Sequence, residues 1–151
     1  MISHAPEDYV CPFCRNLRDG TGDFPVEIVR AYDEVTVKLN PKWWVRNKGA
    51  VLVVPNDHYE NVYDLPVELG TPMQRAIRDA ALAIKAAFAC DGVSTRQHNE
   101  PAGYQDVWHY HVHVFPRYEG DGLYGSRDVY WPDAEEMRAY ADRLRAAWPS
   151  S

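Results

Sequence analysis

The sequence predicts an α+β fold, with an antiparallel sheet of about five strands, one main helix and a second helix near the C-terminus. Two observations lead to this prediction. Several short segments rich in β-branched and aromatic residues are separated by turns, which is typical of strands. Two longer segments carry apolar residues at helical spacing. The helices are expected to cover one face of the sheet.

The expected strands follow one another along the chain. Residues 26–32 (VEIVRAY) and 35–39 (VTVKL) form the first two. Residues 49–55 (GAVLVVP) are strongly apolar, so this strand is expected at the centre of the sheet. Residues 93–99 (VSTRQHN) and 107–115 (VWHYHVHVF) form the fourth and fifth strands, and EPAGYQD turns the chain between them.

The main helix is expected over residues 71–92. Thr71 can cap its N-terminus, Pro72 suits its first position, and Gln74 can complete a capping box. The turn that ends in Gly92 stops the helix. Apolar residues recur along one side, which indicates packing on a core rather than a cofactor site.

The second helix is expected over residues 133–148, with Asp133 as its N-cap and Glu136 at the third helical position. We expect one domain over residues 1–151, because neither a repeat nor a long linker divides the sequence. Residues 1–10 are expected to be flexible, and residues 119–151 to form a C-terminal extension that carries this helix.

The composition excludes several classes of protein. The chain of 151 residues is 46% hydrophobic and 25% charged, which is ordinary for a globular domain. No apolar run approaches the ~20 residues of a membrane span, and the N-terminus does not resemble a signal peptide. We therefore expect a cytoplasmic protein without a membrane partner. The net charge of −6 argues against binding to nucleic-acid polymers, but not against a small anionic ligand.

Three of the six histidines alternate in one short segment, as His109, His111 and His113. Alternate residues of a strand share a face, so their side chains would lie roughly 6–7 Å apart. One or two histidines on a solvent face need no explanation, but three in register favour a function. Neutral imidazole can bind a metal, act as a nucleophile or bind phosphate near pH 7. The pattern alone leaves these three options open.

The cysteines point to a second kind of site. Cys11 and Cys14 form a C-x-x-C motif, CPFC, whereas Cys90 stands alone. In a cytosolic chain a disulfide is not expected, so the motif indicates metal or redox chemistry. Cys90 is expected to pack near a helix end as a small hydrophobic residue.

With these motifs the chain resembles the histidine triad (HIT) family of nucleotide hydrolases and transferases. The family signature is H-φ-H-φ-H-φ-φ, where φ is apolar, and residues 109–115 (HYHVHVF) match it. Pro116 and Arg117 follow, as is frequent in the family. The segments LVVPNDHYENVYDLP and QHN…GYQDVWH resemble the family's central strand with its following histidine and its asparagine and glutamine loop. With CPFC, the resemblance spans residues 10–118 and implies a histidine-triad-like fold.

The resemblance also implies a mechanism. His111 would attack the phosphorus next to a nucleoside and form a covalent nucleotidyl-histidine, which water or another acceptor then resolves. His113 would bind the phosphate and stabilise the charge that develops on it. Asn99 and Gln105 would add neutral donors to the same phosphate. The activity implied is that of a phosphoramidase, a dinucleoside polyphosphate hydrolase or a nucleotidyl transferase.

One branch of the family implies a structural zinc ion. Its ligands would be Cys11, Cys14, His58 and His109, and two thiolates would balance the charge of Zn²⁺. The alternative is that both cysteines are free thiols and that His58 is a surface residue. The family resemblance further implies a homodimer, formed by pairing of the main helices and continuation of the sheet.

The sequence departs from the family pattern at the nucleotide. Lys38 stands where the family commonly has an acidic residue or asparagine that binds ribose, and a lysine cannot accept those hydrogen bonds. Either Asn40 supplies an acceptor, or Lys38 meets an extra anionic group while Trp43 and Trp44 stack on a ring. The alternative is that Lys38 points to solvent and the inserted WWVR packs on the body or the dimer partner. Asp106 replaces a usual serine or threonine, and a carboxylate there would repel phosphate.

Two other functions remain open from the sequence. The first is a zinc-stabilised module that binds nucleotides without turnover. The second is a metallo-oxygenase or cupin-like protein in which the triad histidines bind a catalytic metal. The second would need a carboxylate ligand and would leave CPFC without a role.

Overall fold

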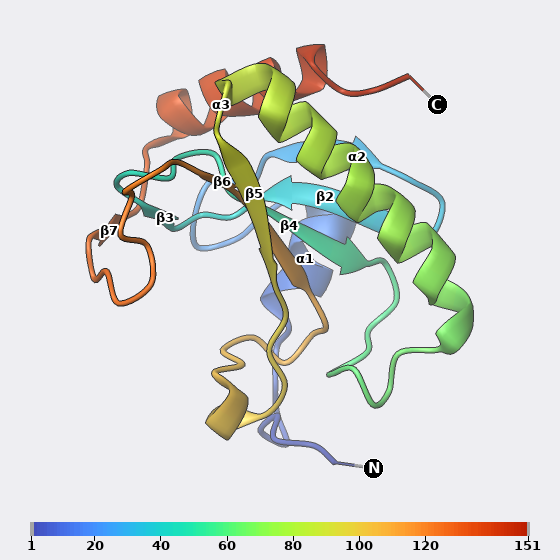
Figure 1. Cartoon of the computed structure of the whole chain (residues 1–151). Helices are drawn as coiled ribbons and strands as arrows, with labels where there is room; N and C mark the ends of the chain where they lie inside the picture. Colours follow the sequence, from blue (N-terminus) through green and yellow to red (C-terminus); the bar gives the residue numbers. More distant parts are fainter. Residues whose placement is uncertain (1, 151) are drawn as a thin grey trace.

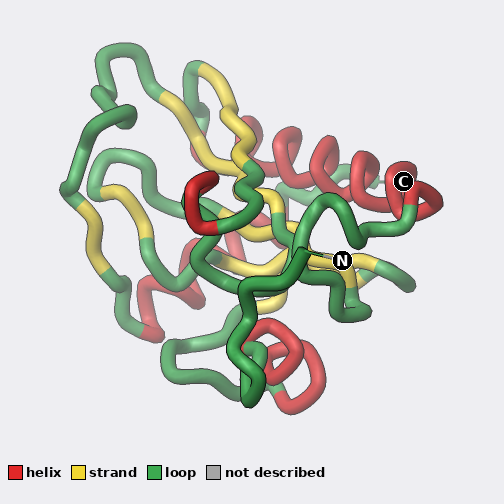
Figure 2. The backbone as a smooth tube through the Cα atoms, turned by 90° about the horizontal axis from the view of Figure 1, so that it is seen from below, coloured by secondary structure: helices red, strands yellow, loops and turns green. Residues whose placement is uncertain are grey.

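The computed structural model describes residues 2–150 and confirms the α+β fold (Figure 1). The strands are β1 (Ile28–Ala31), β2 (Val35–Leu39), β3 (Trp43–Trp44), β4 (Val51–Pro55), β5 (Gly92–Arg96), β6 (Val112–Arg117) and β7 (Val129–Tyr130). The helices are α1 (Pro12–Asp19), α2 (Gly70–Phe88) and α3 (Ala134–Ala146), with short 3-10 turns η1 (Val67–Leu69) and η2 (Pro101–Gly103). Much of the remaining chain is loop, drawn green in Figure 2.

Five strands form one antiparallel sheet in the order β1-β2-β4-β6-β5, so the apolar strand β4 is central, as predicted. Helices α2 and α3 cover one face of this sheet (Figure 1). Val35, Val37 and Leu39 of β2 point to that face, and they share a core with Met73, Ala80 and Ile84 of α2 and with Met137 and Leu144 of α3. Apolar residues at helical spacing thus form the main core.

The opposite face is partly covered as well, which corrects the expectation that only one face is covered. Phe13 of α1 packs on Leu52 and Val54 of β4 in a second apolar cluster. Helix α1 was not predicted, because the cysteine motif is the main pattern that these eight residues show. Cys11 is the N-cap of α1, and its sulfur accepts a hydrogen bond from the Cys14 backbone N–H at 3.4 Å.

The ends of the long helices agree only in part with the prediction. Asp133 caps α3 by accepting a hydrogen bond from the Glu136 N–H at 2.8 Å, as predicted. Helix α2 begins at Gly70 directly after η1, with Leu69 at the N-cap and no side-chain cap, so the capping box at Thr71 is wrong. The helix ends at Phe88, with Ala89 as a C-cap whose φ of 51° is left-handed, rather than at residues 91–92. At the N-terminus of α2, the preceding turn η1 takes the place of the predicted cap.

The small ribbon of β3 and β7 was not predicted. Trp43 pairs with Tyr130 and Trp44 with Val129, so the inserted tryptophans are joined to the C-terminal extension. Trp43 is fully buried against Tyr140 of α3, and Trp44 packs on Phe115 of β6. The WWVR segment therefore packs on the body of the domain, as one of the alternatives held.

The triad segment is shorter as a strand than predicted. Strand β6 begins at Val112, so His109 and His111 precede it and only His113 lies within it. Among residues 2–150 the structure has no helix with both the length and the apolar character needed to cross a membrane. Residues 2–10, expected to be flexible, run along the surface, where Ser3 Oγ and the His4 N–H donate hydrogen bonds to Glu60.

Candidate functional site

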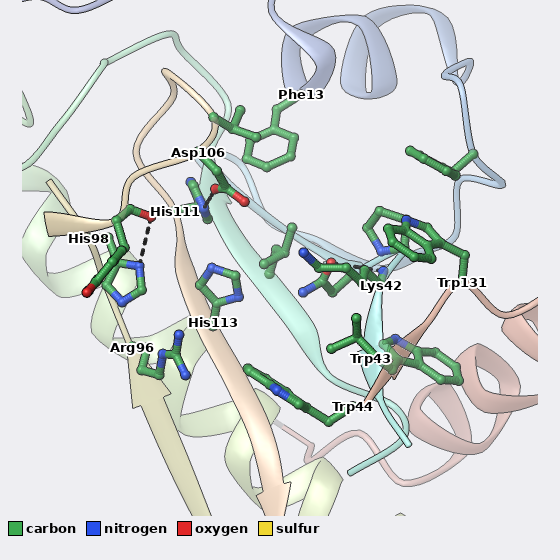
Figure 3. Close-up of a pocket in the computed structure, with 17 residues that line it drawn as sticks. Phe13, Lys42, Trp43, Trp44, Arg96, His98, Asp106, His111, His113 and Trp131 are labelled. Carbon is green, nitrogen blue, oxygen red and sulfur yellow. Dashed lines mark hydrogen bonds and ion pairs between the residues drawn. The ribbon is translucent and has the colours of Figure 1, made fainter. Parts of the chain in front are cut away.

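The end of the triad segment brings two histidines to a pocket of about 550 Å³ (Figure 3). His111 and His113 line it, and the centres of their rings are 5.0 Å apart. Across the sheet, His113 pairs in register with Leu52 of β4 and Arg96 of β5, and both of these also line the pocket. The sheet thus forms the floor of the pocket.

The backbone fixes the orientation of His111. Its Nδ1–H donates a hydrogen bond of 2.6 Å to the carbonyl oxygen of His109. This bond selects the tautomer in which Nε2 carries a lone pair. Nε2 lies 3.7 Å from the carboxylate of Asp106, which also lines the pocket. His111 therefore presents a nucleophilic nitrogen to the pocket, with an exposed carboxylate beside it.

Burial keeps both pocket histidines neutral. Burial, with smaller contributions from the neighbouring His111 and Arg96, lowers the pKa of His113 to about 3. Burial also lowers the pKa of His111, against the opposing effects of the His109 carbonyl and Asp106. A neutral imidazole can attack phosphorus or donate one N–H to a phosphate oxygen.

His109, the first histidine of the triad, belongs to a separate cluster. The ligand atoms of Cys11, Cys14, His58 and His109 all lie within 4.8 Å of one another. His109 Nδ1 is 3.4 Å from the Cys11 sulfur and 3.6 Å from the Cys14 sulfur, and His58 Nδ1 is 3.4 Å from the Cys14 sulfur. These four residues can bind a metal ion.

The distances within the cluster fit a tetrahedral ion. Bond lengths of about 2.3 Å to sulfur and 2.0–2.1 Å to nitrogen place tetrahedral ligands roughly 3.5 Å apart. His109 is fully buried, and its Nε2–H donates a hydrogen bond of 2.9 Å to the Pro55 carbonyl, which leaves Nδ1 free for coordination. A carbonyl partner of this kind fixes the ring of a metal-binding histidine.

The structure places two of the predicted phosphate residues away from the lining of the pocket. Gln105 is buried, and its amide donates hydrogen bonds to the carbonyls of Glu60 (2.6 Å) and Val107 (3.0 Å). Asn99 accepts a hydrogen bond from the Val62 N–H at 2.8 Å and exchanges amide bonds with Gln97. Both side chains hold the loop before the triad in place.

Two residues that bear on the departure from the family pattern are Asn40, on the wall of the pocket, and Lys38, which is buried outside the pocket lining. Asn40 lines the pocket. Lys38 is only 3% exposed, which rules out the alternative that it points to solvent. Its Nζ lies 4.9 Å from the centre of the Phe13 ring, and burial lowers its pKa to about 8. No ion pair to Lys38 is present among residues 2–150.

Sequence reasoning missed one side of the pocket. Arg96, Lys42, Trp131 and Phe24 line it, and so does His98, which the sequence analysis did not assign to the site. The His98 Nδ1–H donates a hydrogen bond of 3.2 Å to the Tyr104 carbonyl. Arg96 was open to prediction, since it ends the strand beside the triad. Trp131 was not, because nothing in the sequence shows that β7 pairs with β3.

Fold and site together define a protein in which two triad histidines line a pocket and the third joins a cysteine–histidine cluster that could bind a metal ion. The chain belongs to the HIT (histidine triad) family, because the model for the HIT domain matches residues 31–120. Protein hit of Bacillus subtilis (strain 168) is 36% identical over 114 residues, which are 75% of this chain and 75% of the relative. Adenosine 5'-monophosphoramidase HNT1 of Saccharomyces cerevisiae is 28% identical over 136 residues, 89% of this chain and 78% of the relative.

Solved structures agree with this assignment. The chain is similar to a Hit-like protein involved in cell-cycle regulation from Bartonella henselae, with a TM-score of 0.82 and 29% identity, over 95% of this chain and 99% of the other. A Zn-bound histidine triad family protein from Mycobacterium smegmatis has a TM-score of 0.74 and 30% identity, over 91% of each chain. The family thus includes a hydrolase of a nucleotide derivative and a metal-bound member.

Proposed function

We propose that the chain is a nucleotidyl hydrolase or transferase that acts on the phosphorus next to a nucleoside, with His111 as the nucleophile. The observation that supports this most is the hydrogen bond from His111 Nδ1 to the His109 carbonyl, which leaves Nε2 free in the pocket. Membership of a family with a monophosphoramidase among its relatives agrees with this reaction.

The reaction would run in two displacements. Nε2 of His111 forms a bond to phosphorus, and the bond from phosphorus to the leaving group breaks; the leaving group keeps that electron pair and takes a proton from water. Water then attacks the same phosphorus, loses a proton to solvent, and returns the electron pair of the P–N bond to Nε2. The products are the free leaving group, a nucleoside monophosphate and the original imidazole. Another acceptor in place of water gives transfer.

We assign the phosphate to His113 and the pocket wall that includes Asn40. His113 lies one strand position beyond the buried Val112 and points into the same pocket as His111 (Figure 3). Asn99 and Gln105 would act indirectly on the phosphate, since their amides already form hydrogen bonds that hold the loop that carries Asp106. This modifies the role that the family resemblance implies for them.

We propose zinc as the metal of the Cys11, Cys14, His58 and His109 cluster, because two thiolates and two imidazoles suit Zn²⁺ in a closed structural site. The ligands tie α1 to His109, whose carbonyl orients His111. A metal there would supply rigidity and charge balance, while His111 and His113 lie outside the cluster. The metallo-oxygenase alternative is therefore not retained.

The test is a trapped adduct. The protein would be mixed with adenosine 5′-phosphoramidate, quenched in milliseconds to seconds, and examined by mass spectrometry for a covalent adenylyl group. The parent protein should carry the adduct and His111→Gly should not, while turnover falls by several orders of magnitude. His4→Gly is the matched control, since His4 lies outside the pocket lining.

Two results would contradict the proposal. Near-parent turnover by His111→Gly would remove His111 as the nucleophile. A parent protein that binds adenosine monophosphate but gives neither adduct nor product would point to the binding module instead. One observation favours that second candidate: the carboxylate of Asp106 lies 3.7 Å from the attacking nitrogen, where it would repel phosphate.

We also propose a homodimer. Leu82 on the outer side of α2 is 44% exposed, and β5 lies at an edge of the sheet, so both elements that the family pairs are available. Light scattering at micromolar concentration should return twice the chain mass, and Leu82→Glu should shift it towards the monomer. A monomeric parent protein would refute this.

A further inference from the structure

The pocket extends well beyond the two histidines that the proposed reaction uses. On the side of His113 it is lined by a group that we call the arginine–tryptophan wall, formed by Arg96, Trp44, Lys42 and Trp131. Arg96 ends β5, Trp44 lies on β3, and Trp131 follows β7. Figure 3 shows these side chains around the opening next to His113. The proposed two-step chemistry gives none of them a role.

Aromatic rings hold Arg96 without neutralising it. In the register of β5 and β6 it lies directly opposite His113. Its guanidinium carbon is 5.2 Å from the centre of the Trp44 ring and 6.0 Å from that of Phe115. Stacking of this kind orients the planar guanidinium and leaves its N–H edges available for a carboxylate or phosphate.

Neither cation of the wall has an acidic partner within the part of the chain that the structure describes. Arg117, Arg138 and Arg145, in contrast, each pair with a carboxylate. Lys42 lies 5.8 Å from the centre of the Trp131 ring. Trp131 in turn stacks on Phe24 at 6.4 Å, and both are about half exposed. The wall is a cationic and aromatic surface whose two charges have no carboxylate partner among residues 2–150.

The charge of the pocket is opposite to that of the whole protein. The chain has a net charge of −6. The pocket is lined by two cations, Arg96 and Lys42, and by one carboxylate, Asp106. A local positive field on an acidic protein selects small anions. When one phosphoryl group lies at His111, the cations beyond His113 remain available to bind a second negative group.

We propose that Arg96, held in place by Trp44, binds a second anionic group on the leaving-group side of the reacting phosphorus. The preferred substrates would be nucleotide esters or amidates whose leaving group itself carries a phosphate or a carboxylate. The chemistry of the substrate supports this placement: the sugar and base of a nucleoside are neutral, so a second anion close to the reacting phosphate belongs to the leaving group. This inference rests on the proposed function of the site and names its substrate class.

The test compares three amidates of adenosine 5′-monophosphate that differ only in the leaving amine: 2-aminoethylphosphonate, glycine and the neutral ethylamine. In the parent protein, kcat/KM for the better of the two charged amidates should exceed that for the neutral one by about tenfold, as a charge-assisted bond implies. A higher value for phosphonate indicates a phosphorylated leaving group, and a higher value for glycine indicates one with a carboxylate. Arg96→Gln should reduce the ratio to near one, because kcat/KM should fall more for the charged amidate than for the neutral one.

The matched control is Arg30→Gln, because Arg30 also stacks on an aromatic ring, that of Tyr32 at 5.6 Å, but lies outside the pocket lining. It should leave the ratio unchanged. Trp44→Ala should reduce the ratio and Trp44→Phe should restore it, since Trp44 is a positioning residue for Arg96. If Arg96→Gln fails to fold, Arg96→Lys tests the same point: it keeps the charge but loses the stacked fork, so the ratio should fall in part.

Several outcomes separate this inference from the proposed function. A parent protein that turns over all three amidates equally, or an Arg96→Gln variant that loses all three equally, would overturn the inference and leave the function of the site intact. Absence of turnover of every amidate by the folded parent protein would overturn both. A ratio that persists in Arg96→Gln would assign the selectivity to another group and refute the role of Arg96.

Discussion

Asp121→Asn should destabilise the domain strongly, although it replaces a single atom in a loop. Asp121 follows β6, and its side chain is only 3% exposed. Its carboxylate accepts five hydrogen bonds, from Arg117 Nε (2.8 Å), Arg117 Nη2 (3.0 Å), Asn47 Nδ2 (2.9 Å), the Tyr118 N–H (2.9 Å) and the Leu123 N–H (3.1 Å). The carboxylate therefore joins the loop after β6 to the insertion that carries the tryptophans.

The expected loss of stability follows from how the five donors are divided between the two carboxylate oxygens of Asp121. Oδ2 accepts three of the bonds and Oδ1 accepts two, so an amide with its nitrogen at the Oδ1 position keeps three and points N–H groups at two donors. A hydrogen bond to a charged group contributes about 1.5–3 kcal/mol, so two lost bonds give roughly 3–6 kcal/mol. For a chain of this size, 1 kcal/mol corresponds to about 2–4 °C in Tm. We expect Tm to fall by roughly 6–24 °C.

The effect should depend on pH in a defined direction. The hydrogen bonds from Arg117, followed by those from Tyr118 and Asn47, outweigh burial and hold the pKa of Asp121 well below its usual range. A carboxyl whose pKa is lower in the folded state stabilises the fold above the unfolded pKa of about 4, and this contribution is lost as the pH falls further. The difference in Tm between the parent protein and Asp121→Asn should therefore narrow below about pH 4.

Thermal unfolding followed by circular dichroism at pH 7 and pH 3.5 would measure both effects. Asp19→Asn is the control, because Asp19 forms only an exposed pair with Arg18 at 3.2 Å. That control should change stability by less than about 0.5 kcal/mol. A Tm for Asp121→Asn within about 2 °C of the parent at pH 7 would show that the reasoning about the buried carboxylate is wrong.

Three further predictions concern the site. Cys11→Ser should lower the zinc content, measured by mass spectrometry, from about one ion per chain, and Tm should fall with it; unchanged content and Tm would refute the zinc assignment. Asp106→Asn should raise kcat/KM for adenosine 5′-phosphoramidate about fivefold, because an exposed charge about 4–5 Å from phosphate costs roughly 1 kcal/mol; a lower kcat/KM would mean that the carboxylate assists the reaction. Lys38→Met should stabilise the fold at pH 7 by about 3 kcal/mol, since burial lowers the pKa of Lys38 to about 8 and the charged lysine therefore destabilises the folded state. That gain should disappear between about pH 8 and 10.5 as the unfolded lysine also loses its proton, and a gain that is constant with pH would contradict it.

The sheet was predictable where the composition of a strand left one interpretation. β2 has the bounds predicted, residues 35–39, because its first three residues are all β-branched and the segment lies between two turns. Strand β4 is central because its apolar run needs cover on both faces, and all five of its residues are buried. The cap of α3 was predictable because the carboxylate of Asp133 stands next to the free N–H groups at the start of the helix and accepts a hydrogen bond from one of them.

Tertiary contacts overrode local signals elsewhere. Thr71 and Gln74 form a plausible capping box. However, η1 runs directly into α2, and its backbone provides the partners for the N–H groups that a cap would have bound. Helix α1 is too short to be stable through its own hydrogen bonds, so it depends on Phe13 packing under the sheet and on the cluster around Cys11. Neither contact is visible in eight residues of sequence.

The two halves of the candidate site differ in the same way. The triad and the cysteine–histidine cluster were predictable, because their chemistry needs specific residue types at close spacing. His109 connects them, because its ring belongs to the cluster and its carbonyl orients His111. The arginine–tryptophan wall has no such local pattern. It exists because a two-residue strand at Trp43–Trp44 pairs with another near the C-terminus, and that pairing places Trp44 beneath Arg96. The reaction can therefore be proposed from the sequence, whereas the proposed choice of substrate rests on a long-range contact that only the structure reveals.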